Sequence, residues 1–295
     1  MTPLPGVPLP AVLARVTAVL KAAGIEGPRR EARLLAAHVL EVAPGALLAD
    51  PDRMLDPAQA AALDALARRR AAREPLSRLV GRRGFWTLDL ALSPDTLDPR
   101  PDTETLVQLA LDLLPPAFAD GRMGRVVDVG TGTGCIVLAL LSERADLQGL
   151  GLDIAPGAAR TARDNARAAG LGDRVAFAVS DLLAAVRGPV DLIVSNPPYI
   201  PTGVLETLDP EVIRFDPRRA LDGGADGLDF YRRLAHDAPR CLAPGGHLAV
   251  EVGQGQADAV AALLSETGFE AVGTRADLAG IARCVHGRRG SQQGR

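Results

Sequence analysis

From Arg125 onward, short apolar runs typical of strands alternate with helical segments, and this alternation constrains the fold more than any other feature. It predicts a parallel sheet with helices on both faces. Ligands of such sheets bind beyond the carboxyl ends of the strands, so we expect the chemistry just after residues 129, 153, 179 and 195. The predicted strands are Arg125–Val129, Leu147–Asp153, Val175–Val179, Val190–Ser195 and His247–Val252, and one intervening helix is Ala158–Ala169.

The residues before this region have a different pattern. Apolar residues recur at helical spacing in three segments with no strand between them, and the second and third segments begin at Pro28 and Pro57. We predict a small helical bundle domain over residues 1–78. Alternating strand formers around Phe85 and Trp86 then predict a β-hairpin or extended connector over residues 79–98. An α/β domain over 99–288 and a disordered tail over 289–295 complete the predicted organisation, which agrees with two domains for 295 residues.

A glycine-rich segment, Gly130-Thr131-Gly132-Thr133-Gly134, follows the first predicted strand of this sheet. Glycines allow a sharp turn and a close approach of ligand to backbone. The spacing differs from the dinucleotide fingerprint, and the segment lacks the Gly-Lys-Ser/Thr of a phosphate-binding loop. The segment is therefore compatible with a ligand-binding turn and also with a tight turn that binds nothing.

Two carboxylates follow the next two strands. Asp153 ends the second strand, where it could accept hydrogen bonds from both hydroxyls of a ribose. Asp181 follows the third strand, where it could accept from an adenine amino group. Each could instead cap the helix that comes after it.

The fourth strand ends in Asn196-Pro197-Pro198-Tyr199. Consecutive prolines cannot donate ladder hydrogen bonds, and they hold the backbone extended with their carbonyls free to accept. The Asn196 side chain adds another carbonyl acceptor, and Tyr199 an aromatic wall. A planar NH2 group could thus donate one hydrogen to Asn196 and the other to a proline carbonyl.

Together these segments resemble the Rossmann-like class I methyltransferases, which use S-adenosylmethionine. Leu242-Ala243-Pro244-Gly245-Gly246 is similar to the turn before the fifth strand of that class. A narrower resemblance, to the PrmC/HemK family, covers nearly the whole chain. Its motifs are Glu74-Pro75, Phe85-Trp86, Pro99–Glu104, Asn196–Tyr199, Phe215–Leu221 and Asp277–Gly280. Asp98 departs from the family, which more often has an apolar residue there, and so does Leu182, where some members have an aromatic residue.

The resemblance implies a class I sheet of seven strands, the last antiparallel, with strands near Ala271–Thr274 and Ile281–His286. It implies that the helical bundle recognises the substrate. It also implies methyl transfer from S-adenosyl-L-methionine, giving S-adenosyl-L-homocysteine, to the glutamine amide nitrogen in the Gly-Gly-Gln motif of class 1 peptide chain release factors.

Residue roles carry over by position. The resemblance implies catalytic roles for Asn196, Pro197 and Tyr199. Substrate contacts are expected from Asn196, Pro197, Pro198, Tyr199, Pro101, Thr103 and Glu104. Cofactor contacts are expected from Gly130, Thr131, Gly132, Thr133, Gly134, Asp153, Ile154, Asp181, Leu182 and Asn196.

The reaction itself can be anticipated in outline. An amide nitrogen is a poor nucleophile, and no Cys, His or Lys stands beside the Asn-Pro-Pro-Tyr motif to form a covalent intermediate. We therefore expect direct displacement, in which catalysis is mostly positioning.

Alternative functions stay open at this point. DNA adenine methyltransferases share the four-residue motif, but a net charge of -3 argues against a DNA-binding groove. A related enzyme that methylates a large-subunit ribosomal protein, and a cofactor-binding module without turnover, are the other candidates. The arginines between residues 68 and 83 could be a solvated helix end or a docking surface for the partner.

Composition bounds the remaining properties. Three separated cysteines and four histidines have no metal-ligand spacing, so we expect no metal. No signal peptide or membrane-spanning stretch is evident, which predicts a cytoplasmic protein that does not bind membranes. We expect a monomer.

Overall fold

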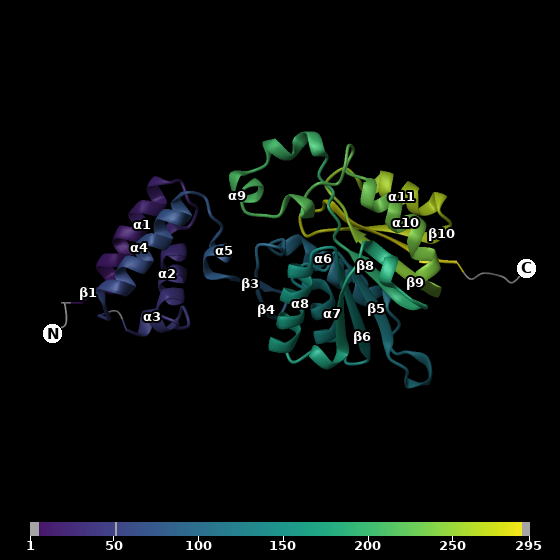
Figure 1. The fold of residues 1–295 in the computed structure, drawn as a ribbon, viewed down its shortest axis with the longest axis horizontal. Coiled ribbons are helices and arrows are strands. Elements are labelled where there is room, and N and C mark those ends of the chain that lie inside the picture. Colours follow the sequence, from purple (N-terminus) through teal and green to yellow (C-terminus); the bar gives the residue numbers. More distant parts are fainter. Residues whose placement is uncertain (1–5, 51, 291–295) are drawn as a thin grey trace, which may run out of the picture. The chain divides into compact units, whose positions relative to one another are not determined.

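The computed structural model describes residues 6–50 and 52–290. The chain divides into two compact units, Met1–Gly81 and Arg82–Arg295, and each is described by itself. The ribbon of both is shown in Figure 1. Within the described ranges, every helix is too short or too polar to cross a membrane.

The N-terminal unit consists mainly of three packed helices, α1 (Leu9–Ala22), α2 (Pro28–Val39) and α4 (Pro57–Ala71), with the short helices α3 (Ala46–Ala49) and α5 (Leu76–Val80). Helices α2 and α4 begin at the predicted prolines. Asp56 caps α4 because its Oδ1 accepts from the Gln59 backbone N–H at 2.8 Å, and the Gln59 side chain accepts from the Asp56 N–H.

A short strand pair in this unit was not predicted. Strand β1 (Val7–Pro8) pairs antiparallel with β2 (Met54–Leu55), which lies between α3 and α4 in the sequence. Two-residue strands are too short to give an alternating pattern, so the sequence carried no signal for them. The pair adds Leu55 to an apolar core built from the inner faces of α1, α2 and α4.

Several arginines of the 68–83 segment form ion pairs inside their own unit. Arg69 pairs with Glu74 at 2.6 Å, and Arg70 is buried against Glu31 at 2.6 Å. In the second unit, Arg82 pairs with Asp89. These pairs leave less positive charge for a partner than the sequence suggests.

The second unit contains a seven-stranded sheet in the order β10-β11-β9-β8-β5-β6-β7. Strands β5 to β9 are parallel, and β11 is antiparallel to both β9 and β10. The predicted class I sheet, with its last strand antiparallel, is confirmed. The strands are β5 (Gly124–Val129), β6 (Leu147–Asp153), β7 (Val175–Val179), β8 (Val190–Ser195), β9 (Leu242–Glu251), β10 (Phe269–Ala276) and β11 (Ala282–Arg289).

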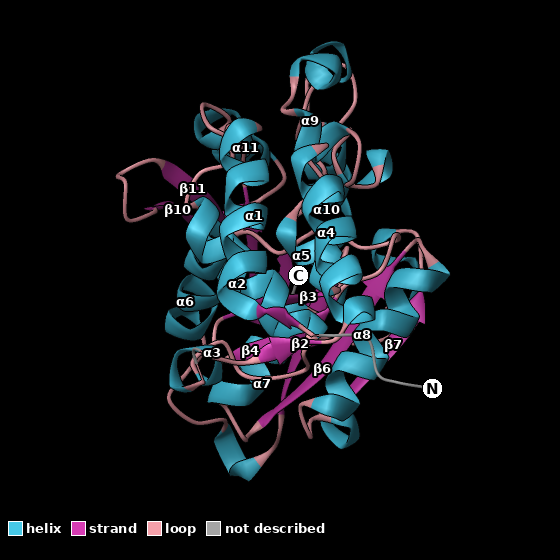
Figure 2. Ribbon diagram, turned by 90° about the vertical axis from the view of Figure 1, so that its left-hand side faces the viewer, coloured by secondary structure: helices cyan, strands magenta, loops and turns pink. Residues whose placement is uncertain are grey.

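Helices cover both faces of this sheet (Figures 1 and 2). Alternate residues of the central strands, such as Val126 and Val127, belong to opposite cores, as the strand period of two requires. One core packs against α6 (Glu104–Leu113), α7 (Cys135–Glu143) and α8 (Pro156–Ala168), the other against α10 (Asp229–Cys241) and α11 (Ala257–Glu266). Shorter elements are η1 (Pro101–Thr103), η2 (Ala119–Gly121), η3 (Gly172–Arg174), η4 (Leu182–Ala185), η5 (Thr202–Thr207), α9 (Pro210–Ile213) and η6 (Arg218–Ala220).

The predicted connector contains an antiparallel hairpin, β3 (Arg82–Phe85) and β4 (Leu88–Ala91), and this hairpin packs on the sheet unit. Asn165 of α8, a buried residue, accepts from the Ala91 N–H at 2.8 Å and donates to the Ala91 carbonyl at 3.1 Å. The same amide group donates to the Thr133 carbonyl at 2.9 Å. Asn165 therefore holds the hairpin and the glycine-rich segment together.

Two predicted boundaries are wrong in detail. Strand β9 begins at Leu242, so the expected turn before it lies within the strand, next to a register shift between Val190 and Leu192 of β8. Strand β11 continues to Arg289 and pairs there with Phe269, so the tail does not begin at 289. Residues 291–295 lie outside the described residues.

Candidate active site

A cavity of about 410 Å³ lies at the carboxyl ends of the parallel strands. Its lining includes Val129 at the end of β5, Asp153 at the end of β6 and Ser195 at the end of β8. The chain runs from β5 outward to β6 and β7 and then returns to the other side of β5 as β8, and crevices form at such switch points. The Ser195 hydroxyl donates to the Val129 carbonyl at 2.7 Å and joins β8 to β5 there.

The glycine-rich segment lines the cavity with left-handed backbone. Gly130 and Gly132 have φ of 72° and 55°, a conformation that disfavours other residues. A Cβ on either glycine would meet nothing nearer than 4.0 Å, so a side chain would enter open space. These two glycines thus keep the backbone accessible to a ligand.

Gly134, a predicted cofactor contact, does not line the cavity. Its φ is 83°, and a Cβ there would lie 3.1 Å from Leu138 and 3.3 Å from Ala162. Gly134 therefore serves the close packing of α7 against α8.

A buried carboxyl group, Asp128, holds the segment from below. Its Oδ2 accepts from the Thr131 hydroxyl at 2.7 Å and from the Val137 N–H at 3.3 Å. Burial raises the pKa of Asp128 to about 7, although both hydrogen bonds act in the opposite direction. Asp128 links the two ends of the turn.

Asp153 lies across the turn, and the described protein groups use only part of its capacity to accept hydrogen bonds. Its Oδ2 accepts from the Gly132 N–H at 2.9 Å and its Oδ1 from the Ala155 N–H at 2.9 Å. A carboxylate has about four acceptor positions, so each oxygen can still accept from a ribose hydroxyl. Burial raises the pKa of Asp153, with these two backbone N–H groups opposing the shift.

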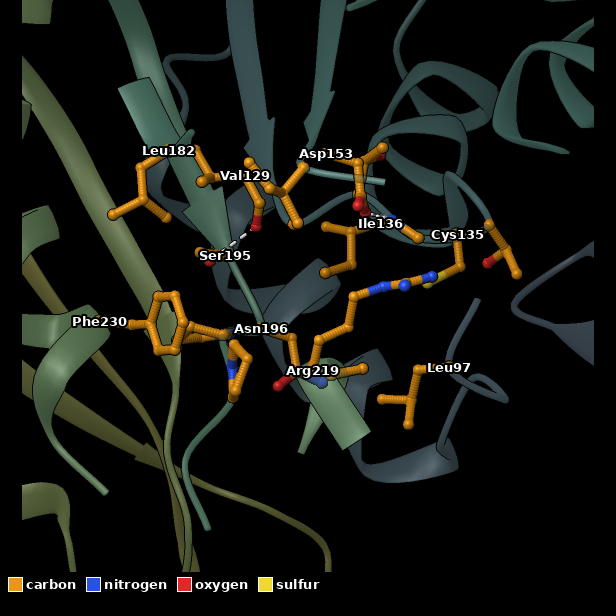
Figure 3. A pocket seen from close by; sticks show the side chains of 18 of the residues that line it. Leu97, Val129, Cys135, Ile136, Asp153, Leu182, Ser195, Asn196, Arg219 and Phe230 are labelled. Atoms are coloured by element: carbon orange, nitrogen blue, oxygen red, sulfur yellow. Dashed lines mark hydrogen bonds between the residues drawn. The ribbon is translucent and has the colours of Figure 1, made fainter. Parts of the chain in front are cut away.

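Apolar side chains stand on the same side of the cavity. Ile154 lines the cavity although it is 60% exposed, and Leu182 lines it with a positive φ of 46°. Figure 3 shows Leu182, Val129 and Asp153 along one wall, facing Phe230, Asn196 and Arg219. An exposed isoleucine beside a carboxylate suits a flat aromatic ring attached to a sugar.

Asp181 also lines the cavity, but it is ion-paired with Arg233 of α10 at 2.7 Å. It does not cap the following 3-10 helix; the Ser180 hydroxyl accepts from the Ala185 N–H instead. The helix-cap alternative for Asp181 is therefore wrong.

Asn196 lies at the centre of the predicted substrate motif and lines the cavity together with Pro197 and Pro198. Its Nδ2 donates to the Thr103 hydroxyl at 3.1 Å. Its Oδ1 is buried and has no hydrogen-bond partner among the described residues. A buried unpaired acceptor is costly, and an N–H donor from a ligand would relieve that cost.

Three other predicted substrate contacts do not line the cavity: Pro101, Glu104 and Tyr199. The Glu104 side chain turns back and accepts from the Trp86 N–H at 2.8 Å. Tyr199 packs with the core on the α10 and α11 face, and burial raises its pKa. The carbonyl of Tyr199 accepts from the Gln256 side chain at 2.9 Å.

The structure adds lining residues that the sequence reasoning had not assigned. Arg219 and Asp95 form an ion pair at the cavity. Arg100 lines it while paired at 2.7 Å with the buried Asp216. Arg100, Asp216 and Arg219 lie in two of the family motifs, Pro99–Glu104 and Phe215–Leu221, and this position was the sequence feature that could have identified them as site residues. The other unassigned lining residues include Leu97, Cys135, Ile136 and Phe230.

The lining fits S-adenosylmethionine in chemical terms. Gly130 and Gly132 leave room along the turn, Asp153 offers acceptors to the ribose, and Ile154 and Leu182 offer apolar surface to the adenine. A volume of about 410 Å³ falls within the usual range for small-molecule sites.

Comparisons with known proteins agree with this site. Residues 11–81 match the PrmC N-terminal domain family, and residues 103–209 match the methyltransferase small domain family. The fold resembles a methyltransferase from Pyrococcus furiosus, with a TM-score of 0.51 at 18% identity over 69% of this chain and 89% of that one.

Two curated relatives cover most of the chain. Release factor glutamine methyltransferase from Rhodospirillum rubrum is 59% identical over 92% of this chain and 82% of its own length. The protein of the same name from Bradyrhizobium diazoefficiens is 44% identical over 97% of each chain. This chain therefore belongs to the PrmC/HemK family of release factor glutamine methyltransferases, which are class I S-adenosylmethionine-dependent enzymes.

Proposed function

We propose that this protein methylates the side-chain amide nitrogen of the glutamine in the Gly-Gly-Gln motif of class 1 peptide chain release factors. The proposal is supported by the family and, above all, by one observation at the site. Asn196 presents a buried carbonyl oxygen that has no hydrogen-bond partner in the described part of the chain, beside two prolines whose backbone cannot donate. The NH2 group of a carboxamide carries two hydrogens, one for the Asn196 oxygen and one for a proline carbonyl oxygen, so these two acceptors would select such a group.

The chain's residues would hold both reactants. Gly130, Gly132 and Asp153 would bind the cofactor along the glycine turn, with the adenine against Ile154 and Leu182. When bound there, S-adenosylmethionine supplies a methyl group activated by its sulfonium. Asn196 and the Pro197 carbonyl would accept the two amide hydrogens of the substrate glutamine and so set the direction of its nitrogen lone pair.

Positioning of this kind can contribute about 7–11 kcal/mol to catalysis. The same acceptors stabilise positive charge that develops on the nitrogen during transfer. The excess proton would then leave to water.

A covalent route through the protein is not part of the proposal. The structure brings Cys135 to the cavity, which the sequence reasoning had not anticipated. Burial, and next the charge of Asp128, raise the pKa of its thiol to about 12. Cys135 therefore stays protonated at neutral pH and is a poor nucleophile.

We further propose that the helical unit recognises the release factor, that the enzyme needs no metal, and that it acts as a cytoplasmic monomer without binding DNA or membranes. A formal net charge of -3 supports the last point for DNA.

The direct test is incubation of the protein with labelled cofactor and purified release factors, followed by peptide mass mapping. The expected result is one methyl group on the glutamine of Gly-Gly-Gln, and none when that glutamine is replaced by alanine. A large-subunit ribosomal protein and adenine-containing DNA serve as competing substrates. Preferential labelling of either would overturn the proposal.

A further inference from the structure

A buried carboxyl group that the proposed reaction does not use lies behind the substrate motif. Glu251 is the last residue of β9 and is only 2% exposed. It is not part of the cavity lining, yet its carboxyl group faces the side chains of Thr103 and Asn196. Its Oε2 has no hydrogen-bond partner in the described parts of the chain.

Thr103 is placed between this carboxyl group and the carboxamide. Its Oγ1 accepts from Asn196 Nδ2 at 3.1 Å. A hydroxyl group has a single proton, so once it accepts from Asn196 that proton remains to be donated elsewhere. The side chain of Glu251 interacts with those of Thr103 and Asn196, and both interactions lower the pKa of its carboxyl group. An ionised carboxylate there would accept the Thr103 proton.

The direction of these hydrogen bonds decides which end of the Asn196 side chain meets a ligand. An ionised carboxylate can only accept, so Thr103 must donate to it and must accept from an amide N–H. The carboxamide nitrogen of Asn196 is then held toward Thr103 and Glu251, and its carbonyl oxygen has no hydrogen-bond partner within residues 6–50 and 52–290. With no fixed acceptor behind Thr103, the hydroxyl could donate to that oxygen and the carboxamide could turn over.

We propose that Glu251 is a positioning residue that acts through Thr103 and keeps the Asn196 carbonyl oxygen available to accept from the NH2 group of the substrate. This inference rests on the proposed function. In this inference, Glu251 and the Thr103 hydroxyl orient the Asn196 side chain but do not bind the reacting nitrogen or the methyl group.

Protonation of Glu251 reverses the arrangement, because a carboxylic acid can donate to Thr103. Burial raises the pKa of Glu251 to about 7, with Thr103, Arg283 and Asn196 lowering it and Asp102 raising it. The other ionisable groups that interact electrostatically with Glu251 are Cys135 of α7, Tyr199 after β8, Tyr231 of α10 and Cys284 of β11. Turnover should therefore increase with pH through about 7.

The test uses the full-length protein, a Gly-Gly-Gln peptide and three substitutions. Thr103→Val keeps the shape but removes the hydroxyl, Thr103→Ser restores it, and Glu251→Gln removes the charge. Tyr231→Phe is the matched control, because it deletes a buried hydrogen bond to the Glu251 backbone carbonyl and leaves the carboxyl group intact.

We expect Thr103→Val to lower kcat about 10- to 100-fold, the scale of a misplaced reacting group. Thr103→Ser and Tyr231→Phe should stay within about threefold of wild type, since each keeps a hydroxyl group at position 103 and the carboxyl group of Glu251. Glu251→Gln should lower kcat less than Thr103→Val, because the glutamine amide can either accept from the Thr103 hydroxyl or donate to it. The same variant should abolish the increase of kcat with pH near 7. Affinity for S-adenosylhomocysteine, measured by calorimetry, should be unchanged in all four variants, which separates positioning from loss of structure.

An unchanged kcat in Thr103→Val, or a rise near pH 7 that persists in Glu251→Gln, would overturn the inference. If Glu251→Gln does not fold, the pH profiles of the two Thr103 variants decide: the rise near pH 7 should be kept in Thr103→Ser and lost in Thr103→Val, and a rise that persists in Thr103→Val would overturn the inference. A wild-type protein that leaves every Gly-Gly-Gln substrate unmethylated would refute the proposed function, whereas active wild type with equally active variants refutes only the role of Glu251.

Discussion

Replacing Asp128 by asparagine should change how the stability of this protein depends on pH. Asp128 is fully buried under the glycine turn, and burial raises its pKa from 3.8 to about 7. Between those values the folded protein holds a proton that the unfolded chain has lost. The contribution of this bound proton to the free energy of unfolding is therefore fully present below about pH 4 and is lost as pH increases through about 7.

The magnitude follows from the size of the increase. Each pH unit well inside that window removes about 1.4 kcal/mol, so the whole increase in pKa corresponds to about 4 kcal/mol. Because the loss becomes smaller near pH 7, where about half of the folded carboxyl groups are ionised, the step from pH 5 to pH 7 removes about 2 kcal/mol. Asparagine keeps an oxygen that can accept from Thr131 and has no charge to bury. The free energy of unfolding of the variant, relative to wild type, should thus increase by about 2 kcal/mol from pH 5 to pH 7.

Urea denaturation of both proteins at pH 5, 6, 7 and 8 measures this difference directly. Taking wild type minus variant at each pH removes the contributions of other buried acids such as Glu251, whose pKa is raised in the same direction. Parallel stability curves for the two proteins would refute the claim that Asp128 is a buried acid with a raised pKa.

Three further predictions concern the site. Asp153→Ala should weaken S-adenosylhomocysteine binding about 10- to 100-fold, because it removes the carboxylate that we propose accepts from both ribose hydroxyls. Calorimetry measures this affinity, with Asp181→Ala as the milder comparison. Asn165→Ala should lower the free energy of unfolding by about 1–3 kcal/mol, because it removes the hydrogen bonds of Asn165 to the hairpin and to the Thr133 carbonyl. A loss no larger than that of the exposed control Asp164→Ala would contradict this prediction. Tyr199→Phe should leave kcat within about threefold of wild type, since Tyr199 lies outside the cavity lining; a large loss would give its hydroxyl a role.

The sheet was predictable because its strands appear as short, largely apolar runs between helical segments. Leu147–Asp153, Val175–Val179 and Val190–Ser195 were located to the residue, although only the last of these is buried along nearly its whole length. The position of the cavity followed, since strand order alone decides where the carboxyl ends converge. The two-residue pair of β1 and β2 was missed because two residues define no period.

Side-chain directions inside the site could not be predicted. Asn196 meets Thr103 across 93 positions of sequence, and Arg219 meets Asp95 across 124. Such contacts depend on how distant segments pack, which no local pattern encodes. Glu104 and Tyr199 were placed in the site because their motifs adjoin it, but each side chain turns toward another partner.

The central claim is that Asn196 clamps a carboxamide for methyl transfer. The measurement that tests it most directly is kcat of Asn196→Ala on a Gly-Gly-Gln peptide, alongside its affinity for S-adenosylhomocysteine. We predict that most turnover is lost, about 100-fold or more, while cofactor binding is partly retained. Turnover near that of wild type would contradict the account.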